Sequence, residues 1–420
     1  MNVDLLITNA SQLLTIPAHN DGPQRGTHLG DIGSIEDGAL AINGESIVDR
    51  GSSADLIKRH QAKQTIDANQ QLVMPGFVDP HTHVVYAGDR ANEFEQRIAG
   101  ASYMEIMNAG GGIMSTVRST RAASIDQLID QTRLRLDRML MHGTTTIEAK
   151  TGYGLETQAE LKMLDAILQL DKQHAIDLVP TFLGAHAIPI EYKGREDAYT
   201  DLVVDEMLPA LSESKPEFVD VFCEAGAFTL AQTRKILIRA KELGYALKIH
   251  VDEFEPLGGT RLGVELGAVS VDHVVSTPQS EVDLLGQSKT IAVGLPGTPF
   301  GLAQKDYTPA KAILEAGGAL SIATDLNPGT SWCESMQMVI ALACRYMKLA
   351  QAQALAAATI NAAFAIGRGE SIGSIEIGKQ ADVLIMDVGD YPSIGYRYGT
   401  NLVKSVIKRG KIVYADGRLL

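Results

Sequence analysis

Two histidines separated by a single residue give the first chemical signal in this sequence. His81 and His83 end an apolar stretch, residues 73–83 (VMPGFVDPHTH). Because side chains alternate along a strand, both imidazoles would point to the same face of a strand that ends here. Two imidazoles on one face can bind one divalent metal ion. A surface turn explains a bare His-x-His pair as well, so the interpretation depends on partners elsewhere in the chain.

Further histidines and an aspartate stand at the ends of later apolar runs. Taken singly, His186 or His273 would be an ordinary core or surface residue. The chain has ten histidines, however, and half of them occupy such positions, which packing alone explains poorly. Three imidazoles and one carboxylate form a ligand set that suits zinc or iron (Fe²⁺ or Fe³⁺) and contains no thiolate. The predicted ligands of one divalent ion are His81, His83, His250 and Asp325.

A metal site of this kind predicts hydrolytic chemistry. A divalent ion lowers the pKa of a bound water towards ~7, so that hydroxide is available at neutral pH. Glu253, three residues after His250, could carry a proton, while His273 could orient the water or stabilise an oxyanion. Asp325 is the alternative proton carrier, and the sequence does not decide between the two carboxylates. Without the histidines around it, Glu253 would equally well be a solvated carboxylate beside a loop.

Strand and helix signals alternate through the middle of the chain. Helical periodicity is clearest in residues 124–142, 156–173 and 229–243. The alternation predicts an α/β fold, a (β/α)₈ TIM-like barrel, in which catalytic side chains collect at the C-terminal ends of the strands. The strands predicted for this barrel are residues 72–78, 144–148, 177–183, 218–223, 246–250, 268–273, 290–295 and 319–323.

Both ends of the chain are rich in short strands. Neither end has enough apolar surface to form a core of its own. We therefore expect residues 1–71 and 367–420 to form one composite β-sandwich domain, with the barrel, residues 72–366, inserted between them. The alanine-rich run 350–366 is expected to be a helix leading out of the barrel, because it is too short and too polar at its ends to span a membrane.

Composition narrows the possible partners and compartments. The formal net charge is −14 at pH 7, which argues against nucleic acid or an anionic membrane surface as a partner. The three cysteines, Cys223, Cys333 and Cys344, form no C-x-x-C pair and fit a reducing compartment. The first residues lack the positive charge of a secretory signal, and no stretch approaches the ~18 uninterrupted apolar residues of a membrane helix. The expected location is the cytoplasm.

The segment 75–83 (PGFVDPHTH) resembles the first-strand signature of the metal-dependent amidohydrolase superfamily. His250, His273 and Asp325 fall where that superfamily has its strand-five, strand-six and strand-eight residues. The segment 373–384 (GSIEIGKQADVL) is similar to the return of the chain into its split β domain. The likeness covers nearly the whole chain and implies a metal-dependent hydrolase.

The resemblance also bears on the number of metal ions. Superfamily members with two ions carry a bridging lysine on strand four, whereas strand four here ends in Cys223 and Glu224. One divalent metal ion per subunit is therefore expected. Lys150 ends strand two, the wrong place for that bridge, and is interpreted as a structural residue or one that lies behind the metal ligands. A homodimer, common in the family, is the expected assembly.

Within this superfamily, four stretches are most similar to the imidazolonepropionase family. They are residues 84–90 (VVYAGDR), 108–113 (NAGGGI), 148–155 (EAKTGYGL) and 325–330 (DLNPGT). The resemblance implies hydrolysis of the cyclic amide of 4-imidazolone-5-propanoate to N-formimidoyl-L-glutamate by water activated on the metal, the third step of histidine degradation. One small departure is Thr151, which stands where serine is common.

The same resemblance implies a set of substrate-binding residues. The substrate carries a propanoate, which the guanidinium of Arg90 could hold through two parallel hydrogen bonds. Gly152 and Gly154 flank Tyr153 and let the backbone come close to a ligand. By position, Arg90, Tyr153, His186 and Glu253 match the residues that hold the substrate, and Asn327, Gly329 and Thr330 match those that contact the product.

Two other features carry less weight. The glycines at 110–112 lack the G-x-x-x-x-G-K-[ST] spacing of a phosphate loop and are interpreted as a mobile loop over the site. Trp332 is expected to pack against the protein and not to stack on a ligand.

Two rival functions use the same residues. A mononuclear deaminase of a nitrogen heterocycle would need the same histidines and carboxylates, but Arg90 and Tyr153 favour a substrate that bears a carboxylate. A non-catalytic barrel that binds or scaffolds would be expected to have lost some metal ligands, and all four are present here.

Overall fold

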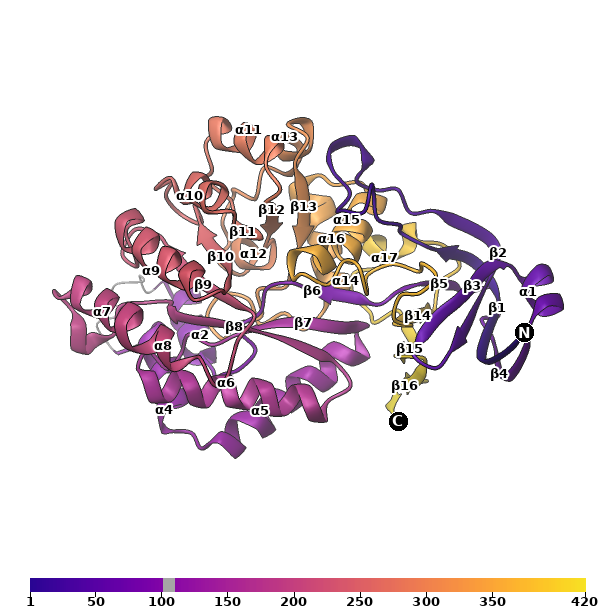
Figure 1. Ribbon diagram of the computed structural model, residues 1–420, viewed down its shortest axis with the longest axis horizontal. Coiled ribbons are helices and arrows are strands. Elements are labelled where there is room, and N and C mark those ends of the chain that lie inside the picture. The colour runs from indigo at the N-terminus through magenta and orange to yellow at the C-terminus, as the bar shows by residue number, and fades with distance from the viewer. Residues whose placement is uncertain (101–109) are drawn as a thin grey trace.

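The structure, a computed structural model, describes residues 1–100 and 110–420. Residues 108 and 109, the first two of the stretch 108–113, lie outside these residues. A barrel wrapped in helices forms one side of the molecule, and a mixed β-sheet forms the other (Figure 1). Both ends of the chain lie in the sheet, so the barrel is inserted into it as predicted.

The barrel has eight parallel strands in the order in which they occur along the chain, which confirms the predicted fold class. Its strands are buried apolar runs, as expected for parallel strands covered on both faces. They are β6 (Phe77–Asp79), β7 (Thr144–Lys150), β8 (Asp177–Ala185), β9 (Phe218–Cys223), β10 (Ala246–Val251), β11 (Ser270–His273), β12 (Ile291–Gly294) and β13 (Ala319–Ile322).

The barrel closes between its first and last strands through side chains and the segments that follow them. The Asp79 carboxylate accepts hydrogen bonds from the Thr324 N–H (3.1 Å) and hydroxyl (2.5 Å). Just beyond the strand ends, the Asp325 N–H donates to the His81 carbonyl (3.1 Å), and the His83 N–H donates across the same seam (2.9 Å). Closure of the barrel therefore brings the predicted ligands of β6 and β13 together.

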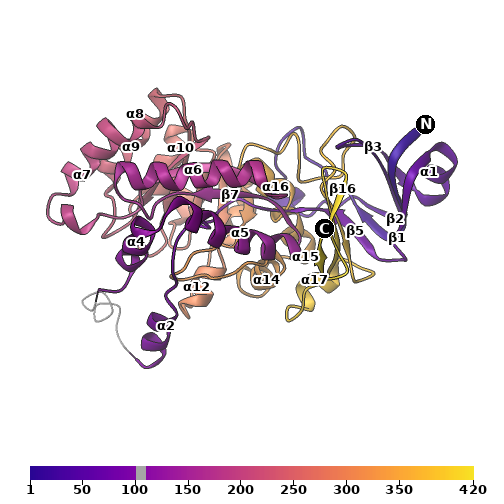
Figure 2. The ribbon, with the colours of Figure 1, turned by 90° about the horizontal axis from the view of Figure 1, so that it is seen from below.

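Helices cover the outside of the barrel (Figure 2). Ser124 and Thr229 begin two of the predicted helices, and each forms a capping box with the glutamine three residues later. The helices in the described part of the chain are α1 (Ser53–Arg59), α2 (Ala91–Ile98), α4 (Ile113–Ala122), α5 (Ile125–Met141), α6 (Thr157–Gln173), α7 (Glu196–Leu202), α8 (Leu208–Ala210), α9 (Leu230–Glu242), α10 (Gly259–Leu266), α11 (Gln279–Gln287), α12 (Gly297–Gly301), α13 (Ala310–Glu315), α14 (Met336–Leu342), α15 (Gln351–Ala357), α16 (Ile360–Ala365) and α17 (Pro392–Tyr396).

The small β domain is one nine-stranded mixed sheet made from both ends of the chain. Strand β5 lies at its centre, parallel to β1 and antiparallel to β14, and so joins the N-terminal and C-terminal strands. The strands are β1 (Asn2–Leu14), β2 (Ser34–Asn43), β3 (Ser46–Ser52), β4 (Gln61–Asp67), β5 (Leu72–Pro75), β14 (Val383–Met386), β15 (Val403–Lys408), β16 (Lys411–Ala415) and β17 (Arg418–Leu419).

The predicted strand 72–78 is wrong as a single element. It is divided into β5, which belongs to the mixed sheet, and β6, which belongs to the barrel. The chain changes sheets at Gly76, where a Cβ would lie 2.4 Å from the Thr145 side chain. Uniform hydrophobicity does not reveal this change, because both halves are buried. The domain division at 71/72 stays a prediction, although strand pairing itself changes at Gly76.

The predicted helix 350–366 is also divided, into α15 and α16. The break follows from competing hydrogen bonds, because the Ala358 carbonyl accepts from Val78 (3.0 Å) in the barrel. The Thr359 hydroxyl donates back to the Leu355 carbonyl (2.7 Å). As a result α16 turns under the barrel and packs against residues at the start of its strands, such as Val78 and Phe218.

A buried ion-pair cluster joins the sheet to the barrel. Lys408 of β15 is 3% exposed, and its ammonium lies 2.7 Å from both Asp177, at the start of β8, and Asp382. Arg409 adds a second contact to Asp177 (2.7 Å). Burial alone would raise the pKa of Asp177, but Lys408 and Arg409 lower it overall. This junction holds the two parts of the molecule in a fixed relation.

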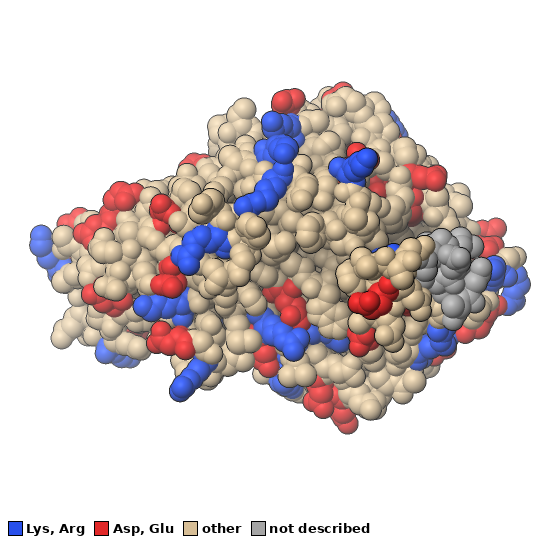
Figure 3. Space-filling view, turned by 180° about the vertical axis from the view of Figure 1, so that it is seen from behind, with Lys and Arg blue, Asp and Glu red and all other residues tan. Residues whose placement is uncertain are grey.

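The surface carries both signs of charge. On the face in Figure 3, acidic and basic side chains are interspersed. Of the helices in the described ranges, none is long and apolar enough to cross a membrane.

Candidate metal and substrate site

The predicted site residues come from four strand ends of the barrel. His81 and His83 follow β6, His250 lies in β10, His273 ends β11 and Asp325 follows β13. His273 and Asp325 have left-handed backbone conformations, with φ of 77° and 51°. Such conformations are uncommon for residues other than glycine and gather at functional sites. Here they turn both side chains inward over the mouth of the barrel.

The distances between the predicted ligand atoms fit a single ion. His250 Nε2 lies 3.3 Å from His83 Nε2, and Asp325 Oδ1 lies 3.5 Å from Nε2 of both His81 and His83. Two ligands ~2.1 Å from a tetrahedral zinc ion are separated by about 3.4 Å. The arrangement therefore leaves a centre of suitable size among the four side chains.

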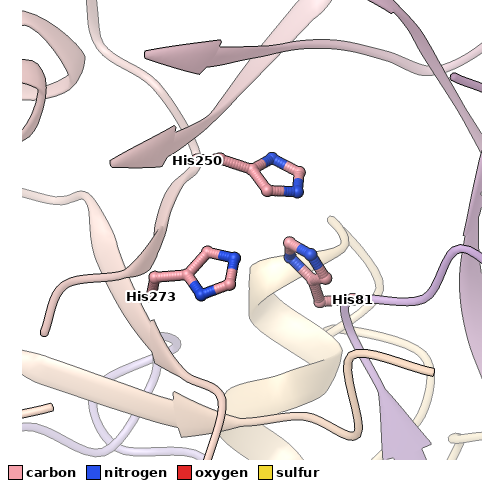
Figure 4. A group of neighbouring side chains, drawn as sticks. All are labelled: His81, His250 and His273. Carbon is pink, nitrogen blue, oxygen red and sulfur yellow. The ribbon is translucent and has the colours of Figure 1, made fainter. Parts of the chain in front are cut away.

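His273 also belongs to this group. Donor atoms of His81, His250 and His273 all lie within 4.8 Å of one another, and their rings converge in Figure 4. His273 is thus close enough to contact an ion or a ligand bound to it. From the sequence, only a catalytic role was predicted for His273.

The unpaired atoms of the cluster support a metal site. His81 Nε2 and Asp325 Oδ1 are buried and have no hydrogen-bond partner among the described residues. A buried polar atom without a partner is costly, and a cation would satisfy both. Burial, together with nearby positive charge, holds the pKa of His81 and of His83 well below the usual value. Both imidazoles are therefore neutral, the form that binds metal. The residues fit a divalent ion.

Glu253 lies beside the cluster. Its carboxyl oxygen Oε2 is 3.6 Å from His273 Nε2, and the side chain is 10% exposed. Burial, then the negative charges of Asp325 and Glu224, raises the pKa of Glu253 well above its usual value. Burial likewise raises the pKa of Asp325 to about 6. Two carboxyl groups with raised pKa values next to a ligand space are suited to proton transfer near neutral pH.

His186 and Tyr153 form one wall of the space. The His186 ring stacks on His83 with centroids 4.7 Å apart, and the ring centroid of Tyr153 lies 5.3 Å from that of His186. Nδ1 of His186 contacts the Gly152 carbonyl at 3.0 Å and so acts as the donor. Its other ring nitrogen is then an acceptor. The prediction that both residues bind a ligand is consistent with this placement.

The turn that carries Tyr153 is held from two sides. The buried Glu160 carboxylate accepts from the N–H groups of Gly152 (2.9 Å), Gly154 (2.7 Å) and Leu155 (2.8 Å). Arg121 donates to the Gly154 carbonyl (2.6 Å) from the opposite side. Neither residue was predicted from the sequence, although Glu160 occupies the first turn of α6, where carboxylates often bind N–H groups.

Arg90 reaches the site from the start of α2. Its Nε donates to Glu93 Oε2 (2.8 Å), and Glu93 Oε1 accepts from the Gly112 N–H (3.0 Å). Gly112 lies immediately before α4, so the segment links Arg90 and Glu93 to the start of this helix. A Cβ at Gly329 would lie only 2.2 Å from Arg90 Nη1. A side chain at 329 would therefore force the guanidinium to move from this position.

The segment after Asp325 is organised by Asn327. Its Oδ1 accepts from the N–H groups of Gly329 and Thr330, each at 2.8 Å, and its Nδ2 donates to the Asp325 carbonyl (2.7 Å). The contact of these residues with a product stays a prediction. Their observed role is to shape the segment that passes beside Arg90.

A cavity of about 650 Å³ has Arg90, Gly329 and Thr330 in its wall, whereas the histidines of the cluster do not line it. Trp332 lines it as well, packs edge-on against Tyr86 with centroids 5.4 Å apart, and remains 46% exposed. The cavity places the predicted carboxylate-binding residue within reach of a small molecule.

Comparison with known proteins agrees with this geometry. The model of the amidohydrolase family matches residues 72–413. Proteins named imidazolonepropionase align over nearly their whole length. The protein of Herpetosiphon aurantiacus is 55% identical, over 98% of this chain and 97% of the relative. That of Chloroflexus aggregans is 49% identical, over 98% and 99%.

Solved structures with this fold include deaminases. An adenosine deaminase from Xanthomonas campestris with bound zinc has a TM-score of 0.75 and 22% identity, covering 100% of this chain and 94% of that chain. A guanine deaminase from E. coli has a TM-score of 0.72 and 16% identity, covering 98% and 99%. At these identities the likeness shows the fold alone. The chain itself belongs to the amidohydrolase family and, within it, to the imidazolonepropionases.

Proposed function

We propose that this chain hydrolyses 4-imidazolone-5-propanoate to N-formimidoyl-L-glutamate. The observation that carries the proposal is full-length identity of up to 55% with proteins named imidazolonepropionase. The convergence of the four predicted ligands at the mouth of the barrel supports it. The rival deaminase reading rests on structural neighbours of 16–22% identity, which share the fold but do not indicate the substrate.

Zinc or iron is the proposed cofactor, held by His81, His83, His250 and Asp325. A divalent ion in such a site acts as a Lewis acid that activates water and polarises a carbonyl. The nitrogen and oxygen donors suit both metals. The presence of zinc in the related adenosine deaminase structure makes zinc the first metal to test.

The residues around the metal site would position the substrate. Arg90, fixed on one edge by Glu93, offers its remaining N–H groups to the propanoate. Tyr153 and His186 face the ring from the wall of the site. His186 can accept a ring N–H because its Nδ1 is engaged with Gly152.

Glu253 and His273 are proposed to manage the protons. Hydrolysis adds hydroxyl to the ring carbonyl carbon, breaks the bond from that carbon to the ring nitrogen, and delivers a proton to this nitrogen. Glu253 would carry the proton, and His273 would stabilise the negative charge that develops on the carbonyl oxygen. Asp325 remains the alternative proton carrier.

The direct test is an assay of purified, zinc-loaded protein on 4-imidazolone-5-propanoate. N-formimidoyl-L-glutamate should appear with one equivalent of metal bound per chain. Release of ammonia from candidate purines or pyrimidines, with the imidazolone left intact, would replace the proposal with the deaminase function. A protein that binds no transition metal would favour the scaffold function.

Arg90→Ala is expected to lower kcat/KM by about 100-fold, because charged hydrogen bonds contribute ~1.5–3 kcal/mol each. The loss should appear mainly in KM, with metal content unchanged, when steady-state rates and metal analysis are compared. Arg234→Ala is the control, because Arg234 is an exposed arginine of α9. Loss of metal together with activity would contradict a substrate-binding role for Arg90.

Glu160→Gln is expected to raise KM by about tenfold, since an amide nitrogen cannot accept one of the three N–H groups that hold the Tyr153 turn. Metal content should not change. The control is Glu156→Gln, which alters an exposed carboxylate four residues earlier. A wild-type KM for Glu160→Gln would show that the turn holds its shape without this carboxylate.

A further inference from the structure

Charged side chains fill the barrel interior next to the predicted metal ligands. Barrel interiors are usually packed with branched apolar residues, and buried charges are costly unless they are paired. Each of these side chains is 0% exposed, and they come from four strands of the barrel: Glu148 and Lys150 of β7, Asp220 of β9, Lys248 of β10 and Asp272 of β11.

Strand alternation explains their position. Lys248 and His250 are two residues apart on β10, so both side chains point into the barrel, with Lys248 one layer further from the mouth. Glu148 and Lys150 have the same relation on β7. The charged layer therefore lies immediately behind the imidazoles.

Lys150 is the centre of this layer. Its ammonium donates to Glu148 Oε1 (2.6 Å) and Asp220 Oδ2 (2.7 Å) and lies 3.8 Å from Asp272 Oδ2. Lys248 lies 3.6 Å from the same oxygen of Asp272. Three carboxylates against two ammonium groups leave one net negative charge behind the imidazoles, which favours a cation in front of them.

Two of the carboxylates contact predicted metal ligands. Asp272 Oδ2 accepts from His81 Nδ1 at 2.6 Å, and Asp220 Oδ2 lies 2.9 Å from His250 Nδ1. These are the same oxygens that face Lys150. A carboxylate on Nδ1 fixes the imidazole tautomer and its ring orientation, and leaves the Nε2 lone pair for a metal.

We infer that Asp220 and Asp272, held in place by Lys150, are positioning residues that aim His250 and His81 at the metal ion. The inference rests on the proposed metal site and not on the identity of the substrate. In this arrangement the single ammonium group of Lys150 holds two carboxylates that come from different strands.

The test is metal affinity of the full-length protein, measured with Zn²⁺ in competition with a chromophoric chelator. Asp220→Asn and Asp272→Asn should each bind Zn²⁺ about 10–100-fold more weakly, the usual cost of losing such a partner. Both should also change the visible absorption of the Co²⁺-loaded protein, which reports ligand geometry. Wild-type affinity and spectrum in both variants would overturn the inference.

Lys150→Met is expected to weaken Zn²⁺ binding in the same direction. Its effect and that of Asp220→Asn should be less than additive, because both act on the same carboxylate oxygen. Fully additive effects would show that Lys150 does not act through Asp220, and would contradict its proposed role in holding this carboxylate.

Lys408→Met is the matched control. It also removes a buried ammonium bound to two carboxylates, but at the junction between sheet and barrel. It should lower the thermal stability and leave Zn²⁺ affinity unchanged. An equal loss of affinity in this variant would mean that metal binding merely follows stability, and would overturn the inference.

Ser270→Ala provides a milder variant if the aspartate variants fold poorly. The Ser270 hydroxyl donates to Asp272 Oδ1 (2.6 Å), and its removal changes little volume. A smaller loss of Zn²⁺ affinity is expected, and an unchanged affinity would count against the role of Asp272. No substrate is used in these measurements. They therefore test the metal-binding inference even if the protein fails to hydrolyse the imidazolone.

Discussion

Replacing Glu253 with glutamine is expected to lower kcat by about 10²–10⁴-fold, the usual contribution of a positioned proton carrier. The side chain is nearly buried and its carboxyl lies 3.6 Å from His273, so bulk water is a poor substitute. Glutamine keeps the shape but cannot exchange the proton. KM and metal content should stay close to those of the unaltered protein, because Glu253 is not among the predicted ligands. Steady-state kinetics and metal analysis of the same preparation check both points.

Glu255→Gln is the control for this variant. Glu255 lies in the same loop, two residues further on, and is exposed. Its replacement should leave kcat unchanged. If Glu253→Gln keeps a near-normal kcat, Glu253 has no part in proton transfer and Asp325 becomes the carrier to test. If Glu253→Gln instead loses its metal, the carboxyl acts as a ligand or supports one.

The barrel could be predicted because its strands have a simple signature. Parallel strands covered on both faces are short apolar runs, and helices with a 3.6-residue period separate them. The polar residues that follow such runs, among them His250 and His273, then collect at one end of the barrel. The clustering of the predicted metal ligands therefore follows from the strand pattern.

The two wrong predictions concern segments whose structure depends on contacts with distant parts of the chain. Residues 72–78 are apolar throughout, yet the first part pairs with β14 of the mixed sheet and the second with β7 of the barrel. Residues 350–366 have helical composition, but the Ala358 carbonyl bonds to Val78 of the barrel. Neither competing contact is local in sequence, so no pattern within the segments could reveal it.

The charged layer behind the histidines was also missed, apart from the reading of Lys150 as a residue behind the site. Asp220 stands between Val219 and Val221, and an aspartate at an inward position of a buried strand is a visible signal. Its partners, however, depend on which side chains meet across the barrel. That is set by the tilt and stagger of all eight strands, which the sequence does not display.

The residues for the substrate came from family resemblance and not from spacing. The structure adds a physical reason for one of them. Gly329 has no room for a Cβ because the Arg90 guanidinium occupies that space. A larger residue there would displace the group proposed to hold the propanoate, so Gly329 acts through Arg90 as well as through any contact of its own.

The other large effect is expected from His83→Ala, which removes one of the four predicted ligands. Bound metal should fall from about one equivalent to a small fraction, because His83 Nε2 lies within 3.5 Å of both His250 Nε2 and Asp325 Oδ1. With the Lewis acid lost, kcat/KM should fall by about 10³-fold or more, since a metal supplies several kcal/mol of transition-state stabilisation. Metal analysis and kinetics before and after addition of excess Zn²⁺ measure both effects.

His28→Ala is the control, because His28 is exposed in the N-terminal loop, where it stacks on His19. Its metal content and kinetics should match those of the unaltered protein. The position of His83 makes the comparison decisive. Its N–H bonds across the seam where the first and last strands close the barrel, and alanine keeps that backbone bond. A His83→Ala protein that folds but holds no metal would therefore show that the imidazole binds the metal and that the backbone N–H alone maintains the seam. A variant that keeps a full equivalent of metal would remove His83 from the ligand set.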